Sequence, residues 1–212
     1  MSATPDPRDG DSDRDTGAEA AAAARGLLEQ HAEAVRLSVS GCAPSGTASG
    51  APRLPCTGCT VRDLVDHVTG EQPWIPPVVT EGRTIEEIGD AFSADVLGGD
   101  PVGAWERASG AAHAAFAVPG ALDRTVRLSY GPVLGRAYRA GLTADCVVHA
   151  RDLSRGIEAD DRLPDGLVEF ALEEVMPYAD GLAAGGLFAA PPEVPAGANA
   201  QTRLLALMGG RG

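Results

Sequence analysis

The chain has 212 residues, of which 44% are hydrophobic, enough for one substantial domain with a small appendage. The net charge is −13 and all 17 basic residues are arginine. This acidic balance argues against a nucleic-acid partner, because phosphate binding requires a basic surface. No apolar run approaches the roughly 20 residues needed to cross a bilayer, so we expect no membrane partner either.

The N-terminal region is predicted to be an acidic tail followed by a helix. Residues 1–16 carry five aspartates and almost no large apolar side chain, which is typical of a disordered, solubilising segment. This stretch lacks the basic start and the apolar run of a signal peptide, so a cytoplasmic location is expected. A helix is expected over residues 18–40, with His31 on its apolar face, and the Pro-rich residues 41–55 are expected to form a loop.

Cys56 and Cys59 have the Cys-x-x-Cys spacing that occurs in redox and zinc sites. No second pair of this kind completes a four-ligand zinc site, and no buried strand precedes the motif as in a thioredoxin-like unit. Free thiols are the favoured interpretation in a reducing cytosol. A redox role and a metal-binding role stay open as alternatives.

The next expected helix carries His67. Thr60 and Asp63 match the capping-box pattern at its start, and Gly70 is the expected stop. The apolar residues between these positions share one helix face, with His67 at its edge. The three prolines within residues 73–77 are expected to break or redirect the chain after this helix.

Further elements follow in chain order. The stretch 100–120 opens with Asp-Pro, which is typical of a helix start, and closes with Pro-Gly, where we expect that helix to end. Residues 125–134 alternate in polarity and turn at Tyr130, which predicts a short β-hairpin or an extended loop. After the helix described next, others are expected at residues 165–178 and around the leucines of residues 204–207.

The pair of ionisable residues Asp145 and His149 is the most informative feature of the sequence. The two lie four residues apart on a helix expected to end near Gly156, so their side chains share one face, beside an apolar stripe that includes Cys146. Burying a carboxylate without a partner is costly, and a metal ion would remove that cost. With His67, the pair makes a two-imidazole, one-carboxylate set that suits Zn²⁺, Ni²⁺ or Fe²⁺ and leaves a position open for a water or a substrate thiolate.

Several blocks of the chain, including Asp-Leu-Val-Asp-His-Val around His67 and Ala-Asp-Cys-Val-Val-His around Asp145 and His149, resemble a known family. They are similar to the metal-binding domain of mycothiol-dependent maleylpyruvate isomerases, within the DinB-like superfamily, and to an actinobacterial branch of it. The family's metal ligands match His67, Asp145 and His149. The similar blocks lie at residues 55–68, 100–102, 119–123, 128–133 and 144–153.

The resemblance runs from about residue 20 to the end and implies an all-α fold. The expected architecture is a DinB-like four-helix bundle with a short β-hairpin or extended loop and a small C-terminal appendage. We therefore expect a disordered acidic tail at residues 1–16, a metal-binding helical bundle at residues 17–190, and a C-terminal extension at residues 191–212 that packs on the bundle.

Two departures from the family limit what the resemblance implies. Many relatives carry tryptophan where this chain has Cys59 and Arg151, and the isomerase has a C-terminal domain that we do not expect a chain of this length to contain in full. Maleylpyruvate isomerisation is therefore not expected to transfer. The implied cofactor is a divalent metal, zinc above nickel or iron, and the implied cosubstrate is a low-molecular-weight thiol such as mycothiol.

These residues together predict a thiol-dependent S-transferase or isomerase that uses a metal-activated thiolate or water as its nucleophile. Its partners would be a small-molecule thiol and an electrophilic substrate, and the protein would be a monomer or a homodimer. The alternative is a non-catalytic metal-binding or structural helical-bundle protein, in which the metal only staples the helices or is absent.

Five more residues are candidates for the site. Asp152 could fix the orientation of a metal ligand, or form an ordinary salt bridge with a neighbouring arginine. Tyr130 could form part of the pocket wall, or pack on the bundle as a turn residue. Three arginines flank the site helix and could hold an anionic substrate, unless they are solvated: Arg136, Arg139 and Arg151.

Overall fold

The computed structural model describes residues 26, 33, 34, 36, 60–92, 96–178 and 193–208. The four described residues within the expected 18–40 helix are helical. Predictions for the acidic tail, for His31 and for the pair Cys56 and Cys59 fall outside the described residues.

Helix α2 spans Val61–Glu71 and begins as predicted, because the Thr60 side chain accepts from the backbone N–H of Asp63 and the Asp63 carboxylate accepts from the backbone N–H of Thr60. Gly70, however, does not stop it. The chain continues through the 3₁₀ turn η1 (Gln72–Trp74) into helix α3 (Ile75–Thr80). Each of these elements has a proline in its first turn, where a missing N–H costs nothing.

Two helices, a 3₁₀ turn and a β-hairpin follow α3 in the chain. The short helix α4 spans Ile85–Ile88, and helix α5 spans Pro101–Ala117. The 3₁₀ turn η2 (Ala121–Asp123) leads into the antiparallel hairpin of β1 (Thr125–Leu128) and β2 (Gly131–Leu134). The predicted helix start at Asp-Pro and the predicted hairpin are both present.

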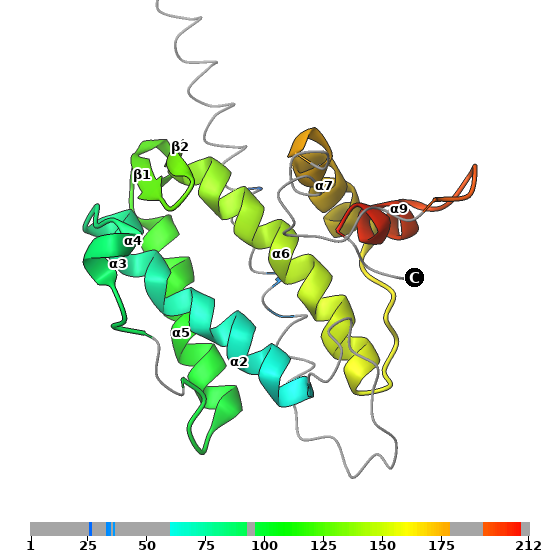
Figure 1. The fold of residues 1–212 in the computed structure, drawn as a ribbon, viewed down its shortest axis with the longest axis horizontal. Helices are drawn as coiled ribbons and strands as arrows, with labels where there is room; N and C mark the ends of the chain where they lie inside the picture. Colours follow the sequence, from blue (N-terminus) through cyan, green and yellow to red (C-terminus); the bar gives the residue numbers. More distant parts are fainter. Residues whose placement is uncertain are drawn as a thin grey trace, which may run out of the picture.

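Helix α6 (Gly135–Gly156) is the longest described helix and carries the Asp-His pair. Figure 1 shows it running between two groups of helices, with α2 and α5 on one side and α7 and α9 on the other. Helix α7 spans Asp165–Val175 and is followed by the 3₁₀ turn η3 (Met176–Tyr178), and helix α9 spans Ala200–Leu207.

The core consists of three clusters of buried side chains along α6. One lies between α6, α7 and α9, the second holds α3, α5 and the hairpin together, and the third joins α2 to α5 and α6. The third cluster includes Leu64, Val65, Trp105 and Leu153, so apolar packing helps to hold α2 against α6.

The described chain is therefore mostly helical, with one two-stranded sheet. None of its helices in the described part has the length and hydrophobicity of a transmembrane span.

Candidate functional site

Two histidine–carboxylate pairs lie where α2 meets α6. Helix α2 carries His67 and Glu71, and helix α6 carries Asp145 and His149, each pair one turn apart. His67 Nε2 lies 3.6 Å from Glu71 Oε1, and His149 Nε2 lies 3.4 Å from Asp145 Oδ1. The two imidazole rings meet edge to face, with their centroids 5.2 Å apart. The fold thus brings the three predicted ligands to one seam and adds Glu71.

The spacing within each pair is that of an ion pair one helix turn apart, and it also fits two donors of one metal ion. Both distances, 3.6 and 3.4 Å, exceed the 2.7–3.2 Å of an ordinary hydrogen bond from nitrogen. Two donors that each lie about 2.1 Å from a tetrahedral zinc ion are about 3.4 Å from one another. Each pair therefore matches one edge of a zinc tetrahedron.

The two pairs do not converge on a common point where one metal ion could be bound. Among the described residues, no three His, Cys, Asp or Glu side chains are grouped so that they could hold a metal ion as they stand. The donors meet in pairs within each helix, and His67 is about half exposed. Binding of one ion by both pairs would require side-chain movement across the seam between α2 and α6.

The charges of the four side chains act on one another. Burial, reinforced by the Asp145 carboxylate, raises the pKa of Glu71 to about 7. Burial lowers the pKa of His67, and the adjacent His149 lowers it further. Burial disfavours charge on His149 as well, but its contact with Asp145 outweighs this effect and raises its pKa. Two close carboxylates beside two imidazoles can be satisfied together by a divalent cation.

One buried ring nitrogen lies outside the two pairs. Within the described part of the chain, His149 Nδ1 is buried without a hydrogen-bond partner, and a metal bound through Nε2 beside Asp145 would not satisfy it. Cys146, between the two α6 residues, is fully buried, and burial raises the pKa of its thiol, so it packs in the core as an inert thiol. The donor chemistry of the seam fits a divalent metal.

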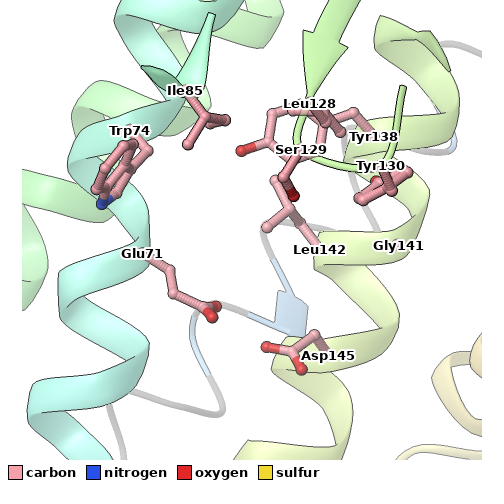
Figure 2. A pocket seen from close by; sticks show the side chains of 10 residues that line it. All are labelled: Glu71, Trp74, Ile85, Leu128, Ser129, Tyr130, Tyr138, Gly141, Leu142 and Asp145. Carbon is pink, nitrogen blue, oxygen red and sulfur yellow. The ribbon is translucent and has the colours of Figure 1, made fainter. Parts of the chain in front are cut away.

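A pocket of about 370 Å³ opens on the two carboxylates. Figure 2 shows Glu71 and Asp145 at one end, on facing helices, and the hairpin residues Leu128, Ser129 and Tyr130 at the other. The volume lies within the range of small-molecule sites. Tyr130 lines the pocket while most of its side chain is exposed. The residues that line the walls are mostly apolar: Trp74, Ile85, Tyr138 and Leu142.

The three arginines expected to hold an anion do not line this pocket. Arg136 pairs with Asp123. Arg139 is fully buried, with its guanidinium 4.9 Å from the centre of the Phe116 ring. The expectation of an anion site at these residues therefore has no support in the geometry, because α6 directs them away from the face that carries Asp145.

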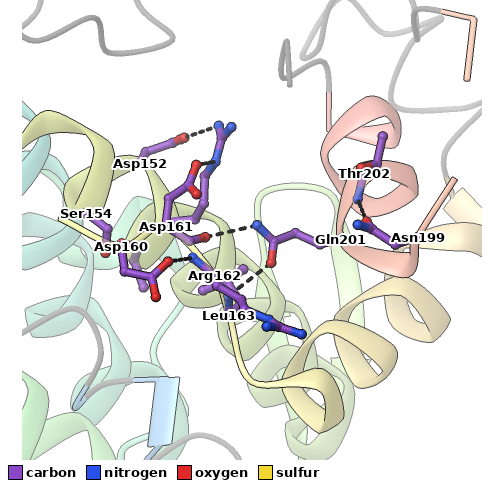
Figure 3. A network of polar contacts seen from close by, with 11 residues as sticks. Asp152, Ser154, Asp160, Asp161, Arg162, Leu163, Asn199, Gln201 and Thr202 are labelled. Atoms are coloured by element: carbon purple, nitrogen blue, oxygen red, sulfur yellow. Dashed lines mark hydrogen bonds and ion pairs between the residues drawn. The ribbon is translucent and has the colours of Figure 1, made fainter. Parts of the chain in front are cut away.

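The third arginine, Arg151, belongs to a buried network (Figure 3) that includes Asp152. Arg151 Nη1 donates to Asp152 Oδ1 at 3.2 Å, and Arg151 Nε lies 3.3 Å from Asp161 Oδ2. Asp152 thus forms the salt bridge that was the alternative to its role beside the metal. Gln201 on α9 extends the network, since it accepts from the backbone N–H of Leu163 and donates to the carbonyl of Asp161.

Comparison with known proteins gives no functional assignment. No family model matches the sequence, and no solved structure matches it. Two relatives, from two strains of Mycobacterium tuberculosis and both described as uncharacterized, are 32% identical over 117 residues. The match covers 54% of this chain and 59% of the relatives' length. The resemblance to the isomerase domain thus stays an expectation.

The sequence analysis missed Glu71, although the signal was present. Glu71 follows His67 by four residues, the same spacing that singled out Asp145 and His149. The two pairs run in opposite orders, carboxylate after histidine on α2 and before it on α6. On facing helices, that order places carboxylate beside carboxylate and imidazole beside imidazole.

Proposed function

We propose that the protein is a metal-dependent enzyme acting on small molecules, a thiol-dependent S-transferase or isomerase. The metal, zinc above nickel or iron, would be held by His67, Asp145 and His149, with one position open for a thiol or water and the Glu71 carboxylate beside it. The observation that carries the proposal is the pair of histidine–carboxylate edges across the α2–α6 seam, at the end of a ligand-sized pocket.

A bound divalent ion would supply acidity, because it lowers the pKa of a coordinated thiol or water and so gives a nucleophile at neutral pH. The residues of the chain prepare the site for it. The lowered pKa of His67 favours the neutral imidazole that a metal ligand must present. Apolar side chains line the pocket walls beside the carboxylates, and in the proposal Ser129 and Tyr130 lie where an incoming thiol or substrate would pass.

In the enzymatic proposal, packing holds the two helices together and the ion serves the chemistry. A buried cluster that includes Leu64, Val65 and Leu153 joins α2 to α6. A structural site would instead couple metal binding to folding. A non-catalytic bundle stays the competing function, and in the enzymatic proposal the partners are a thiol such as mycothiol and an electrophile in the cytoplasm.

Cobalt substitution tests this proposal directly. Chelator-treated protein is titrated with Co²⁺, and visible absorption is recorded before and after addition of N-acetylcysteine. The proposal predicts tetrahedral cobalt bands and, with thiol, a new sulfur-to-cobalt charge-transfer band. His149→Ala should lose both, whereas His113→Ala on α5, outside the site, should keep them. Cobalt bands that never respond to thiol would contradict the thiol-transfer proposal and favour the non-catalytic alternative.

A further inference from the structure

The walls of the pocket are apolar and held in place by stacked rings. Trp74 meets Phe92 edge to face with centroids 5.8 Å apart, and Tyr138 meets Phe116 in the same way at 5.8 Å. Leu142 on α6 lies between the Tyr138 turn and the carboxylate end. These contacts fix two aromatic side chains of the wall before any ligand arrives, which lowers the entropy cost of binding a flat apolar molecule.

The described residues of the pocket include no basic side chain that would attract an anion. Among the described residues that line it, the only Asp, Glu, His, Lys or Arg side chains are those of Glu71 and Asp145, and both are acidic. Three arginines of the same helix are directed elsewhere: Arg136 to Asp123, Arg139 to the Phe116 ring, and Arg151 to Asp152 and Asp161. A ligand carboxylate in the pocket would therefore face two carboxylates without a compensating cation.

We propose that this pocket, without metal, binds an uncharged, apolar small molecule carrying one or two rings in preference to an anion. The volume of about 370 Å³ lies near the lower end of small-molecule sites, which sets the size. This inference goes beyond the proposed function and concerns the metal-free pocket, because a bound divalent ion would offset the charges of the two carboxylates.

Matched probes test the preference in the chelator-treated full chain at about pH 8. The pair is 4-nitrobenzyl alcohol and 4-nitrobenzoate, which share a ring that quenches tryptophan and differ in charge. Trp105→Phe removes the buried core tryptophan and leaves Trp74, in the pocket wall, as the reporter. The alcohol should bind at least tenfold more tightly than the benzoate. Equal or tighter binding of the benzoate, or no quenching by either probe, would overturn the inference.

A charge introduced into the wall gives the converse test. Leu142→Arg should reduce the preference for the alcohol severalfold, because it offsets one of the two carboxylate charges, while Leu134→Arg, on the exposed side of β2 and outside the pocket, should leave it unchanged. Saturation-transfer NMR of both probes on the wild type gives the same comparison if a variant does not fold. A protein that prefers the alcohol yet never binds metal supports this inference and refutes the proposed function. A protein that binds metal but does not prefer the alcohol supports the proposed function and refutes this inference.

Discussion

Glu71→Gln should make the metal-free protein more stable at alkaline pH while weakening its metal binding. Burial and the Asp145 carboxylate raise the pKa of Glu71 from 4.5 to about 7. Between these values the folded protein keeps a proton that the unfolded chain has released, so the stability of the wild type falls as pH rises through this window. Glutamine has no such proton to lose, so in the variant this side chain does not lower the free energy of unfolding as pH rises.

The magnitude follows from the pKa difference and from the exposure of the side chain. Raising the pKa from 4.5 to about 7 corresponds to about 3 kcal/mol before screening. The Glu71 side chain is 40% exposed, and solvent screening reduces the effect to about 1–2 kcal/mol. The variant should therefore exceed the wild type by about 1–2 kcal/mol at pH 8 and should match it near pH 4.5.

Urea denaturation followed by circular dichroism, in chelator at several values between pH 4.5 and 8, measures this difference. Comparing the variant with the wild type at each pH cancels the contributions of His67, His149 and other groups to a first approximation. Glu106→Gln, on the exposed face of α5, is the control. The difference in free energy of unfolding between this variant and the wild type should stay the same at every pH. A Glu71→Gln protein that is no more stable at pH 8, or whose advantage does not vary with pH, would refute the reasoning.

Three further predictions concern the framework of the site, and each is measured by chemical denaturation. Leu153→Ala, at a fully buried position behind α2, should destabilise the fold by about 2–5 kcal/mol; a cost below 1 kcal/mol would argue against the packing described. Gln201→Ala removes two hydrogen bonds of 2.9 Å that tie α9 to the α6–α7 connection and should cost about 1–2 kcal/mol, with faster proteolysis in α9 as a second readout. Gly135→Ala should cost about 1–3 kcal/mol or more, because the new Cβ would lie 2.2 Å from the carbonyl oxygen of Ala121, whereas Gly110→Ala, with open space around it, should be neutral or slightly stabilising.

The sequence predicted the parts of the fold that depend on local chemistry. The Thr60 capping box and the Asp-Pro start at residue 100 each satisfy backbone N–H groups of one helix turn, so the signal and the structure involve the same few residues. The hairpin was visible for the same reason, since alternation and a turn glycine lie within residues 125–134.

Features that depend on neighbours in space were harder to predict. Gly70 looked like a helix stop, but the following proline-containing turns continue the same direction of chain at no cost in hydrogen bonds. Arg139 looked solvated or anion-binding, and it is buried against Phe116 because α5 packs on that face of α6. Glu71 shows the limit most clearly: its role depends on Asp145, which lies on another helix, and no local pattern reveals that contact.

Metal content is the measurement that tests the central claim most directly. Untagged wild-type protein and His149→Ala are purified side by side, reconstituted with zinc, desalted and analysed by elemental mass spectrometry. The account predicts about one equivalent of divalent metal in the wild type, as a single mononuclear site requires, and little in the variant. No retained metal in either protein, or equal retention in both, would contradict a metal site at the α2–α6 seam.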